Sequence, residues 1–217
     1  MLIPKILILI QAGIFGLIIG SFLNVLIYRI PLNKSVLGRS YCPSCNEGIP
    51  LYRNVPILSF LLQMGRSACC KNKISWQYPS VEAATGLLSI LTLLYSYSLL
   101  EYTIWFLLFM CPLVVITVID FQLKIIPDII SLSFILVGII IQQYLQYPSW
   151  WEALKFSGIG LLLGGGVLLL LAEFMSRLLK KEAMGGGDIK LMAMLGAFLG
   201  PKAFLFIYIA GSFTALI

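Results

Sequence analysis

The chain has 217 residues, of which 60% are hydrophobic and 11% are charged. Soluble domains are about a quarter charged, so this composition excludes an ordinary soluble protein and predicts an integral membrane protein. The chain has no histidine, which excludes Ser-His-Asp and Cys-His catalysis and any histidine-ligated metal. The net charge of +6 fits basic cytoplasmic loops, so we expect membrane lipid and not nucleic acid as a partner.

The first predicted element is an apolar helix over residues 2–27, which is long enough to cross a membrane. No small-residue cleavage site follows the run, so we interpret it as a retained helix and not as a signal peptide. Residues 1–28 are therefore expected to form the first transmembrane helix. Its glycines share one face that is suited to close helix packing: Gly13, Gly16 and Gly20.

A polar loop follows over residues 29–79 and carries seven Lys or Arg residues against the single acid Glu47. This bias places the loop in the cytoplasm and the N-terminus outside. Four of the five cysteines lie in this loop: Cys42, Cys45, Cys69 and Cys70. The fifth, Cys111, stands in an apolar run and is expected to pack there.

Residues 80–217 are expected to form the membrane core, with helices at 80–99, 103–120, 129–146, 155–179 and 189–217. The last is broken at Gly200-Pro201, so the fold is an all-α polytopic bundle of about six to seven transmembrane helices. Alternating the spans leaves twelve of the fifteen basic residues on the inner side. The run Gly164-Gly165-Gly166 lacks an adjacent charge and is expected to pack against another helix.

The same alternation brings two carboxylates to the inner face, because Asp120 ends one predicted helix and Asp188 begins another. Facing aspartates share a proton, so one can activate water while the other acts as an acid. This chemistry needs no histidine, metal or other cofactor. Three glycines precede Asp188 and would let a substrate backbone approach: Gly185, Gly186 and Gly187.

The residues alone leave two other interpretations open. Asp120 and Asp188 could be unrelated helix-terminal residues, although only Asp188 would lie at the helix end where the dipole favours a carboxylate. Paired membrane carboxylates also relay protons or bind cations, as in a proton- or cation-coupled transporter. Asp128 follows Ile126-Pro127 and is expected to cap the next helix.

Two motifs carry a resemblance to a known family. Asp120 is followed after a short gap by Ile126-Pro127-Asp128, and Gly185-Gly186-Gly187-Asp188 matches a Gly-x-Gly-Asp signature. The chain resembles the type IV prepilin peptidases, which are polytopic membrane aspartic proteases. Further blocks occur in the family order: Gly20-Ser21-Phe22-Leu23-Asn24-Val25, Tyr28-Arg29-Ile30-Pro31, Cys42-Pro43-Ser44-Cys45, Asn54-Val55-Pro56-Ile57-Leu58-Ser59 and Tyr78-Pro79-Ser80-Val81-Glu82.

The resemblance implies an endopeptidase of the bacterial inner membrane. It would remove the basic leader of a type IV prepilin or type II pseudopilin, cutting after glycine at the cytoplasmic face with Asp120 and Asp188 as catalytic residues. It also implies N-methylation of the new N-terminal Phe with S-adenosylmethionine, associated with the loop. The competing reading is a methyltransferase or scaffold with an idle peptidase site.

Two residues near these motifs have open roles. Lys190 would position substrate or act as an interfacial lysine, and Glu82 would be structural or part of the methylation site.

The chain departs from the family pattern in two places. The family loop often binds Zn²⁺ through two Cys-x-x-Cys pairs, but here Ser67 stands where the third cysteine is expected and Cys69 is an extra neighbour. The loop is therefore either a zinc site made by Cys42, Cys45, Cys69 and Cys70 or a reduced thiol cluster. The sequence also stops at Ile217 where family members continue, which indicates a short protein or a truncated one.

Overall fold

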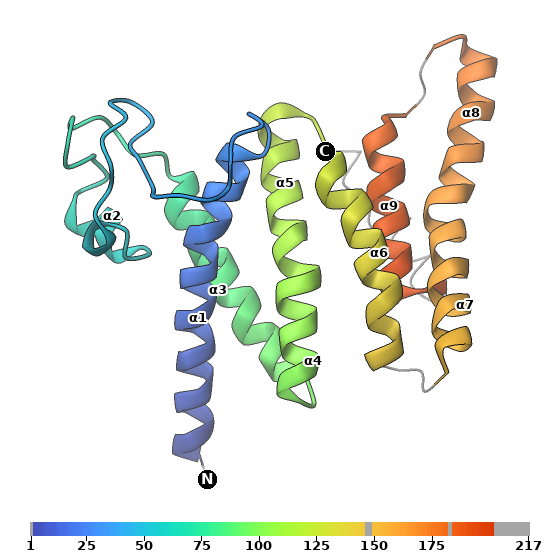
Figure 1. Ribbon diagram of the computed structural model, residues 1–217, viewed down its shortest axis with the longest axis horizontal. Helices are drawn as coiled ribbons and strands as arrows, with labels where there is room; N and C mark the ends of the chain where they lie inside the picture. Colours follow the sequence, from blue (N-terminus) through green and yellow to red (C-terminus); the bar gives the residue numbers. More distant parts are fainter. Residues whose placement is uncertain (1, 146–148, 182–183, 202–217) are drawn as a thin grey trace. The chain divides into compact units, whose positions relative to one another are not determined.

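The computed structural model describes residues 2–145, 149–181 and 184–201. Over these ranges the chain is helical, and its only β-type pairs are isolated bridges in the polar loop. The all-α prediction is therefore confirmed. Contacts divide the chain into two compact units, Met1–Gln122 and Leu123–Ile217, which we describe separately (Figure 1).

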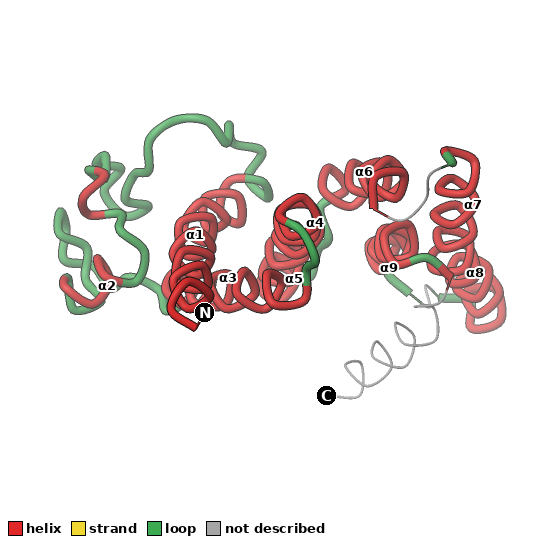
Figure 2. The backbone as a smooth tube through the Cα atoms, turned by 90° about the horizontal axis from the view of Figure 1, so that it is seen from below, coloured by secondary structure: helices red, strands yellow, loops and turns green. Residues whose placement is uncertain are grey.

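The first unit begins with the long helix α1, Leu2–Arg29. The polar loop contains a 3₁₀ turn, Leu51–Arg53, and the short helix α2, Leu58–Leu62. Helix α3, Gln77–Tyr95, then runs beside α1, as the ribbon and the tube view show (Figures 1 and 2). The unit ends with a nearly continuous helix made of three parts: α4, Leu99–Thr103, a π-helical segment, Ile104–Met110, and α5, Cys111–Leu123.

The glycine face of α1 is buried against α3, as predicted. A Cβ atom at Gly16 would lie 2.6 Å from Cβ of Ser89, and one at Gly20 would lie 2.8 Å from Cα of Glu82. The Ser89 hydroxyl donates a 2.6 Å hydrogen bond to the carbonyl of Ala12, which satisfies a polar group inside the interface. Small residues therefore let the two backbones approach closely next to the polar loop.

The second unit contains α6, Asp128–Leu145, and α7, Trp150–Leu161. A π-helical segment, Leu162–Gly166, joins α7 to α8, Val167–Leu179, and helix α9, Gly186–Leu199, packs against α6, α7 and this segment. A Cβ atom at Gly165 would lie 2.6 Å from Cβ of Ala193, and Gly164 faces the carbonyl of Met192. The expected packing role is confirmed for these two glycines.

Three helical stretches are long and apolar enough to cross a membrane: Lys5–Arg29, Leu99–Leu123 and Trp150–Leu179. Asp128–Gln142 is a shorter apolar helix. Their large apolar side chains are widely exposed, as lipid contact requires, and Leu170 on α8 is 70% exposed. A helical membrane protein is therefore confirmed, while the number of six to seven spans and their orientation stay predictions.

The structure places two further expectations. Cys111 is buried among apolar residues, as expected. Helix α9 ends at Leu199, just before Gly200 with its φ of 67°, so the predicted break is present. The second half of the predicted 189–217 helix lies outside the described residues.

Candidate functional site

The polar loop is built from two hairpins with the same backbone pattern, which we call the first hairpin (residues 40–49) and the second hairpin (residues 65–74). Each is closed by an antiparallel bridge, Tyr41 with Gly48 in the first and Arg66 with Lys73 in the second. The same hydrogen bonds recur 25 residues apart: the Ile49 N–H donates to Ser40 O, and the Ile74 N–H donates to Gly65 O. The loop is therefore an internal repeat.

This repeat aligns Ser67 with Cys42 and Cys70 with Cys45. The four cysteine sulfurs nevertheless gather in one cluster and lie within 4.8 Å of one another. The Sγ atoms of Cys42 and Cys70 are 3.8 Å apart, and those of Cys45 and Cys69 are 3.1 Å apart. Ser67 has no sulfur, and Cys69 supplies the fourth sulfur of the cluster in its place. Cys69 does so from a position two residues after the one that the motif predicts.

The cluster gathers four sulfur atoms, the number that a tetrahedral metal site requires. Zn–S bonds of about 2.3 Å place the sulfurs of such a site about 3.8 Å apart, which the Cys42–Cys70 pair matches, whereas the Cys45–Cys69 pair is closer at 3.1 Å. The Ser67 hydroxyl lies 2.8 Å from Sγ of Cys69 and 3.6 Å from Sγ of Cys42, where it supports both sulfurs by hydrogen bonding. Four thiols with a hydroxyl beside them can hold a metal ion as a closed site.

The thiols differ in acidity because their surroundings differ. Burial by itself raises the pKa of Cys42, but hydrogen bonds from the Ser67 hydroxyl and from the backbone of Cys45 and Ser44 outweigh it and lower the pKa to about 6. The neighbouring Cys69 thiol raises the pKa of Cys45 to about 12. The cluster therefore already contains one thiol that deprotonates readily, as a metal ligand must.

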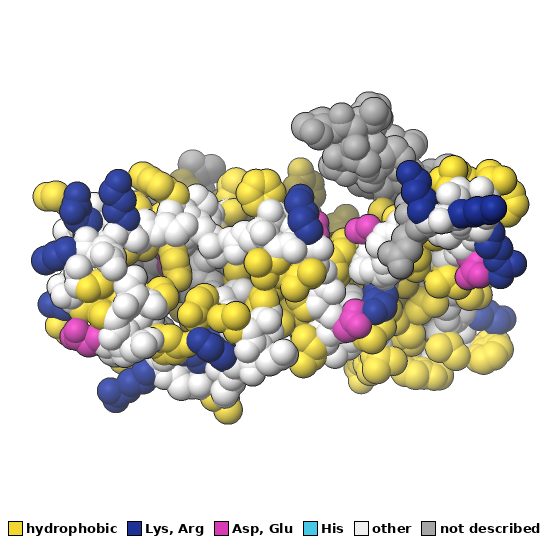
Figure 3. All heavy atoms as spheres, turned by 90° about the horizontal axis from the view of Figure 1, so that it is seen from above, with side chains coloured by type: hydrophobic (Ala, Val, Ile, Leu, Met, Phe, Trp, Pro, Cys, Tyr) yellow, Lys and Arg dark blue, Asp and Glu magenta, His cyan; other side chains and the backbone are white. Residues whose placement is uncertain are grey.

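Basic side chains spread over this loop, which Figure 3 shows from above. Arg29 is the exception because it is only 5% exposed, at the end of α1. Its guanidinium donates to the carbonyls of Ser35, Leu37 and Arg39 at 2.8 to 3.1 Å. The start of the loop is thereby fixed to the end of the helix.

Asp188 lies in the first turn of α9, as predicted, and its side chain is exposed. The glycines before it have ordinary backbone angles, with none in the left-handed region. A Cβ atom at Gly187 would lie 3.0 Å from Cβ of Ile126, whereas one at Gly186 would meet nothing within 4 Å. Lack of room for a side chain, and not an unusual backbone conformation, therefore explains the glycine at Gly187. Gly186 has open space beside it.

The two sequence motifs touch each other within the second unit. Lys190 Nζ forms a 2.7 Å ion pair with Oδ1 of Asp128, and Gly187 packs against Ile126. Asp128 is the first residue of α6, where the helix dipole favours a carboxylate, and its capping role stays a prediction. The partner of Lys190 was not predicted, since 62 residues separate the pair and nothing in the spacing indicates it.

Asp120 lies in the last turn of α5 and is partly exposed. It forms no hydrogen bond or ion pair with the described residues of its own unit. A carboxylate at a helix C-terminus is disfavoured by the helix dipole, so its position calls for another explanation. Because Asp120 and Asp188 belong to different units, their pairing stays a prediction.

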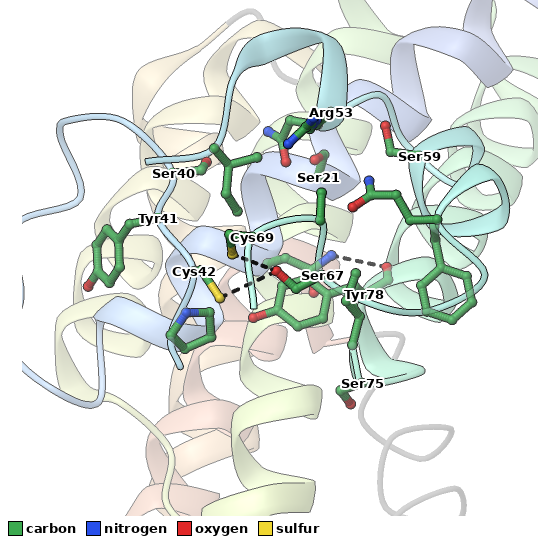
Figure 4. Close-up of a pocket in the computed structure, with 18 of the residues that line it drawn as sticks. Ser21, Ser40, Tyr41, Cys42, Arg53, Ser59, Ser67, Cys69, Ser75 and Tyr78 are labelled. Carbon is green, nitrogen blue, oxygen red and sulfur yellow. Dashed lines mark hydrogen bonds between the residues drawn. The ribbon is translucent and has the colours of Figure 1, made fainter. Parts of the chain in front are cut away.

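A cavity of about 390 Å³ lies between the loop and the facing ends of α1 and α3 (Figure 4). Its polar lining includes Glu82, whose carboxylate accepts a 2.7 Å hydrogen bond from the backbone N–H of Ile57. Asn24 also lines it and is only 3% exposed. Asn24 was not predicted as a functional residue. It stands within a family motif, and a buried amide in an apolar helix is itself a signal of function.

Two family matches cover most of the chain. Residues 14–97 match the family described as the bacterial Peptidase A24 N-terminal domain, and residues 106–217 match the Type IV leader peptidase family. The first match contains both hairpins and the cavity, and the second contains both candidate catalytic aspartates.

Similar proteins extend along nearly the same length. A Neisseria gonorrhoeae protein named prepilin leader peptidase/N-methyltransferase is 32% identical over 232 residues, covering 95% of this chain and 79% of the relative. A Klebsiella pneumoniae protein of the same name is 36% identical over 198 residues, covering 87% and 83%. No solved structure matches the chain.

Proposed function

The chain belongs to the type IV leader peptidase family, and from this membership we propose that it removes the leader from type IV prepilins or pseudopilins and methylates the new N-terminus. The observation that carries the proposal is that both family motifs, with Asp120 and Asp188, stand at helix ends in a membrane protein. The proposed site faces the cytoplasm of a bacterial inner membrane, with the N-terminus of α1 outside, because the basic residues concentrate on that side.

In the proposed cleavage, Asp120 and Asp188 share one proton across a water molecule. One carboxylate takes a proton from this water as it attacks the scissile carbonyl, and the other protonates the leaving amine. Like charges at close range favour such sharing, since both aspartates cannot ionise at low cost. The reaction requires no metal ion, which agrees with the absence of histidine from the chain.

The open side of α9 at Gly186 supports an approach path for the substrate backbone. Without a side chain there, an extended peptide can lie beside the first turn of α9, next to Asp188. Lys190 lies near the start of α9 and pairs with Asp128 at the start of α6, so we assign it to fixing the first turn of α9 relative to α6. Gly185, Gly186, Gly187 and Lys190 together form the proposed substrate-approach loop.

The proposed methylation belongs to the first unit, where the loop and its cavity lie. S-adenosylmethionine would supply the methyl group, and the chain's own residues would bind and orient the amine. Zn²⁺ would be held by Cys42, Cys45, Cys69 and Cys70, because the four sulfurs gather at distances suited to it. It would have a structural role, since four protein sulfurs would complete its set of ligands.

The peptidase assignment is tested by two isosteric variants, Asp120→Asn and Asp188→Asn. Each removes a group that must gain or lose a proton, so we expect leader cleavage to fall by at least about a hundredfold. Glu173→Gln is the matched control, since Glu173 is an exposed carboxylate on α8 paired with Arg177. The measurement is the loss of the leader mass from a prepilin incubated with purified, folded protein. Normal cleavage by either aspartate variant would remove that residue from the mechanism.

The same assay separates the peptidase from the two other interpretations. A proton- or cation-coupled transporter, or a methyltransferase with an idle peptidase site, would leave the prepilin uncut under every condition. Cleavage by the unaltered chain would exclude both.

A further inference from the structure

Asn24 lines the loop cavity and carries an unsatisfied acceptor. Its Nδ2 donates to the carbonyls of Gly20, at 3.3 Å, and Tyr78, at 3.1 Å. These two carbonyls fix the orientation of the amide, because the flipped amide would point Oδ1 at both of them. Asn24 Oδ1 therefore faces away from them and has no hydrogen-bond partner among the described residues, although the side chain is 3% exposed. A buried acceptor of this kind calls for a donor from outside the chain.

Glu82 supplies a second acceptor, and it lies on α3 where this helix packs against Gly20 of α1. It is 7% exposed, and the ion pairs formed by described residues, Arg177 with Glu173 and Lys190 with Asp128, do not include it. Its Oε2 accepts the Ile57 N–H, and Ser21 also interacts with the carboxylate. A carboxylate has about four acceptor positions, so capacity remains for another donor. A positively charged donor would offset the cost of burying this carboxylate in its ionised form.

The backbone at Ile57 is shaped to hold this carboxylate. Ile57 has φ 59° and ψ −49°, and the Leu58 N–H bonds the Pro56 carbonyl across it, which makes a γ-turn. A β-branched residue rarely adopts positive φ, so this turn is strained and its N–H is aimed at Glu82. Strain of this kind is concentrated where a ligand-binding geometry must be held.

The walls of the cavity suit a small organic cation. Tyr78 and Phe60 line it, and aromatic faces attract ammonium groups. Tyr28 also lines it, but Lys34 Nζ already lies 5.2 Å from the centroid of its ring. The neighbouring Arg29 is not a competing cation for Glu82, because its guanidinium is engaged with three loop carbonyls. Arg53 and Lys73 also line the cavity but are exposed, so they stand at its rim.

We infer that this cavity binds a primary ammonium group, which donates to Asn24 Oδ1 and the Glu82 carboxylate. Two molecules could supply this ammonium group, and naming them rests on the proposed function. One is the N-terminus freed when the leader is removed, and the other is the amino-acid end of S-adenosylmethionine. The inference makes Glu82 a ligand-binding residue and not only a structural carboxylate at the start of α3.

The first test uses the unaltered full chain in lipid nanodiscs and a pair of matched probes, phenethylamine and 2-phenylethanol. Both carry the same ring and linker, but only the first has an ammonium group. Isothermal titration calorimetry is expected to show at least tenfold tighter binding of phenethylamine. Equal affinity for the two probes, or no binding of phenethylamine, would overturn the inference.

The second test uses Glu82→Gln, which keeps an acceptor for the Ile57 N–H and removes the charge. We expect it to weaken phenethylamine binding at least tenfold. The matched control is Glu101→Gln, because Glu101 also accepts a backbone N–H, that of Tyr97 at 2.8 Å, but does not line the cavity. Undiminished binding by a folded Glu82→Gln protein would contradict the inference, and if that protein does not fold, the probe pair decides alone.

Competition with S-adenosylhomocysteine distinguishes the two sources. Displacement of phenethylamine assigns the site to the amino-acid end of the cofactor, and simultaneous binding assigns it to the new N-terminus. Leader cleavage is measured on the same preparation. Cleavage without amine binding refutes the inference alone, whereas amine binding without cleavage refutes the proposed peptidase and leaves the ammonium site standing.

Discussion

The two hairpins of the loop share a backbone but not a ligand pattern. The first presents Cys42 and Cys45 at the spacing expected of a zinc hairpin, whereas the second presents Ser67, Cys69 and Cys70. The sulfurs still converge, because Cys69 reaches the cluster from a position between the two standard ones. The comparison teaches that a hairpin can supply a sulfur from a position two residues further along without changing its backbone hydrogen bonds.

The largest expected effect on zinc content comes from replacing Cys45 or Cys70, the two proposed ligands that occupy equivalent positions in the two hairpins. On the zinc proposal, Cys45→Ser and Cys70→Ser each leave three sulfurs, so bound zinc should fall from about one ion per chain to a small fraction. Plasma emission spectroscopy of dialysed protein measures this. Cys111→Ala is the control, since Cys111 is buried in α5 away from the loop. Full zinc content in either serine variant would refute the four-sulfur site.

A smaller effect is expected where the hairpins differ. Cys69→Ser should weaken zinc binding at least tenfold, because Ser67 offers only a hydroxyl in place of the lost sulfur. Adding Ser67→Cys to that variant makes the second hairpin match the first, so zinc affinity should recover. Competition with a chromogenic chelator gives both affinities. If Cys69→Ser alone keeps its zinc, the second hairpin binds through Ser67 and the proposed substitution is wrong.

The smallest effect concerns the shared turn, where Asn46 has φ 58° and Lys71 has φ 60°. Asparagine tolerates this left-handed conformation better than lysine, so Lys71→Asn should stabilise the chain by about 0.5 to 1 kcal/mol. The reverse exchange, Asn46→Lys, should destabilise it by a similar amount. Thermal unfolding with a chelator present reports both changes. Shifts of the same sign would show that the two turns are not equivalent.

The positions of the helices could be predicted because lipid-facing helices are marked by long apolar runs. The helix predicted over residues 2–27 ends two residues before the observed end of α1. The glycine face of α1 was predicted from the spacing of its glycines alone. Asp188 was placed correctly at the start of α9, because a glycine run before an apolar segment marks a helix start. These features depend on residues that are close together in the sequence, so they can be predicted without knowing the fold.

Contacts between distant segments could not be predicted in the same way. The ion pair of Lys190 with Asp128 and the hydrogen bond from Asn24 to Tyr78 join residues that are 62 and 54 positions apart. The repeat of the two hairpins could not be predicted either, because it is carried by backbone hydrogen bonds. Ser67 stands where a ligand is expected, and the contact of its hydroxyl with Sγ of Cys69, at 2.8 Å, could not be predicted either.

The buried guanidinium of Arg29 sets the order in which the first unit can form during synthesis. Its three acceptors end at residue 39, so this contact can close once ten more residues have followed α1 from the ribosome. The partners of α1 on α3 arrive only from residue 77 onward. The turn that follows α1 can therefore fix the C-terminal end of this helix before either hairpin has been made.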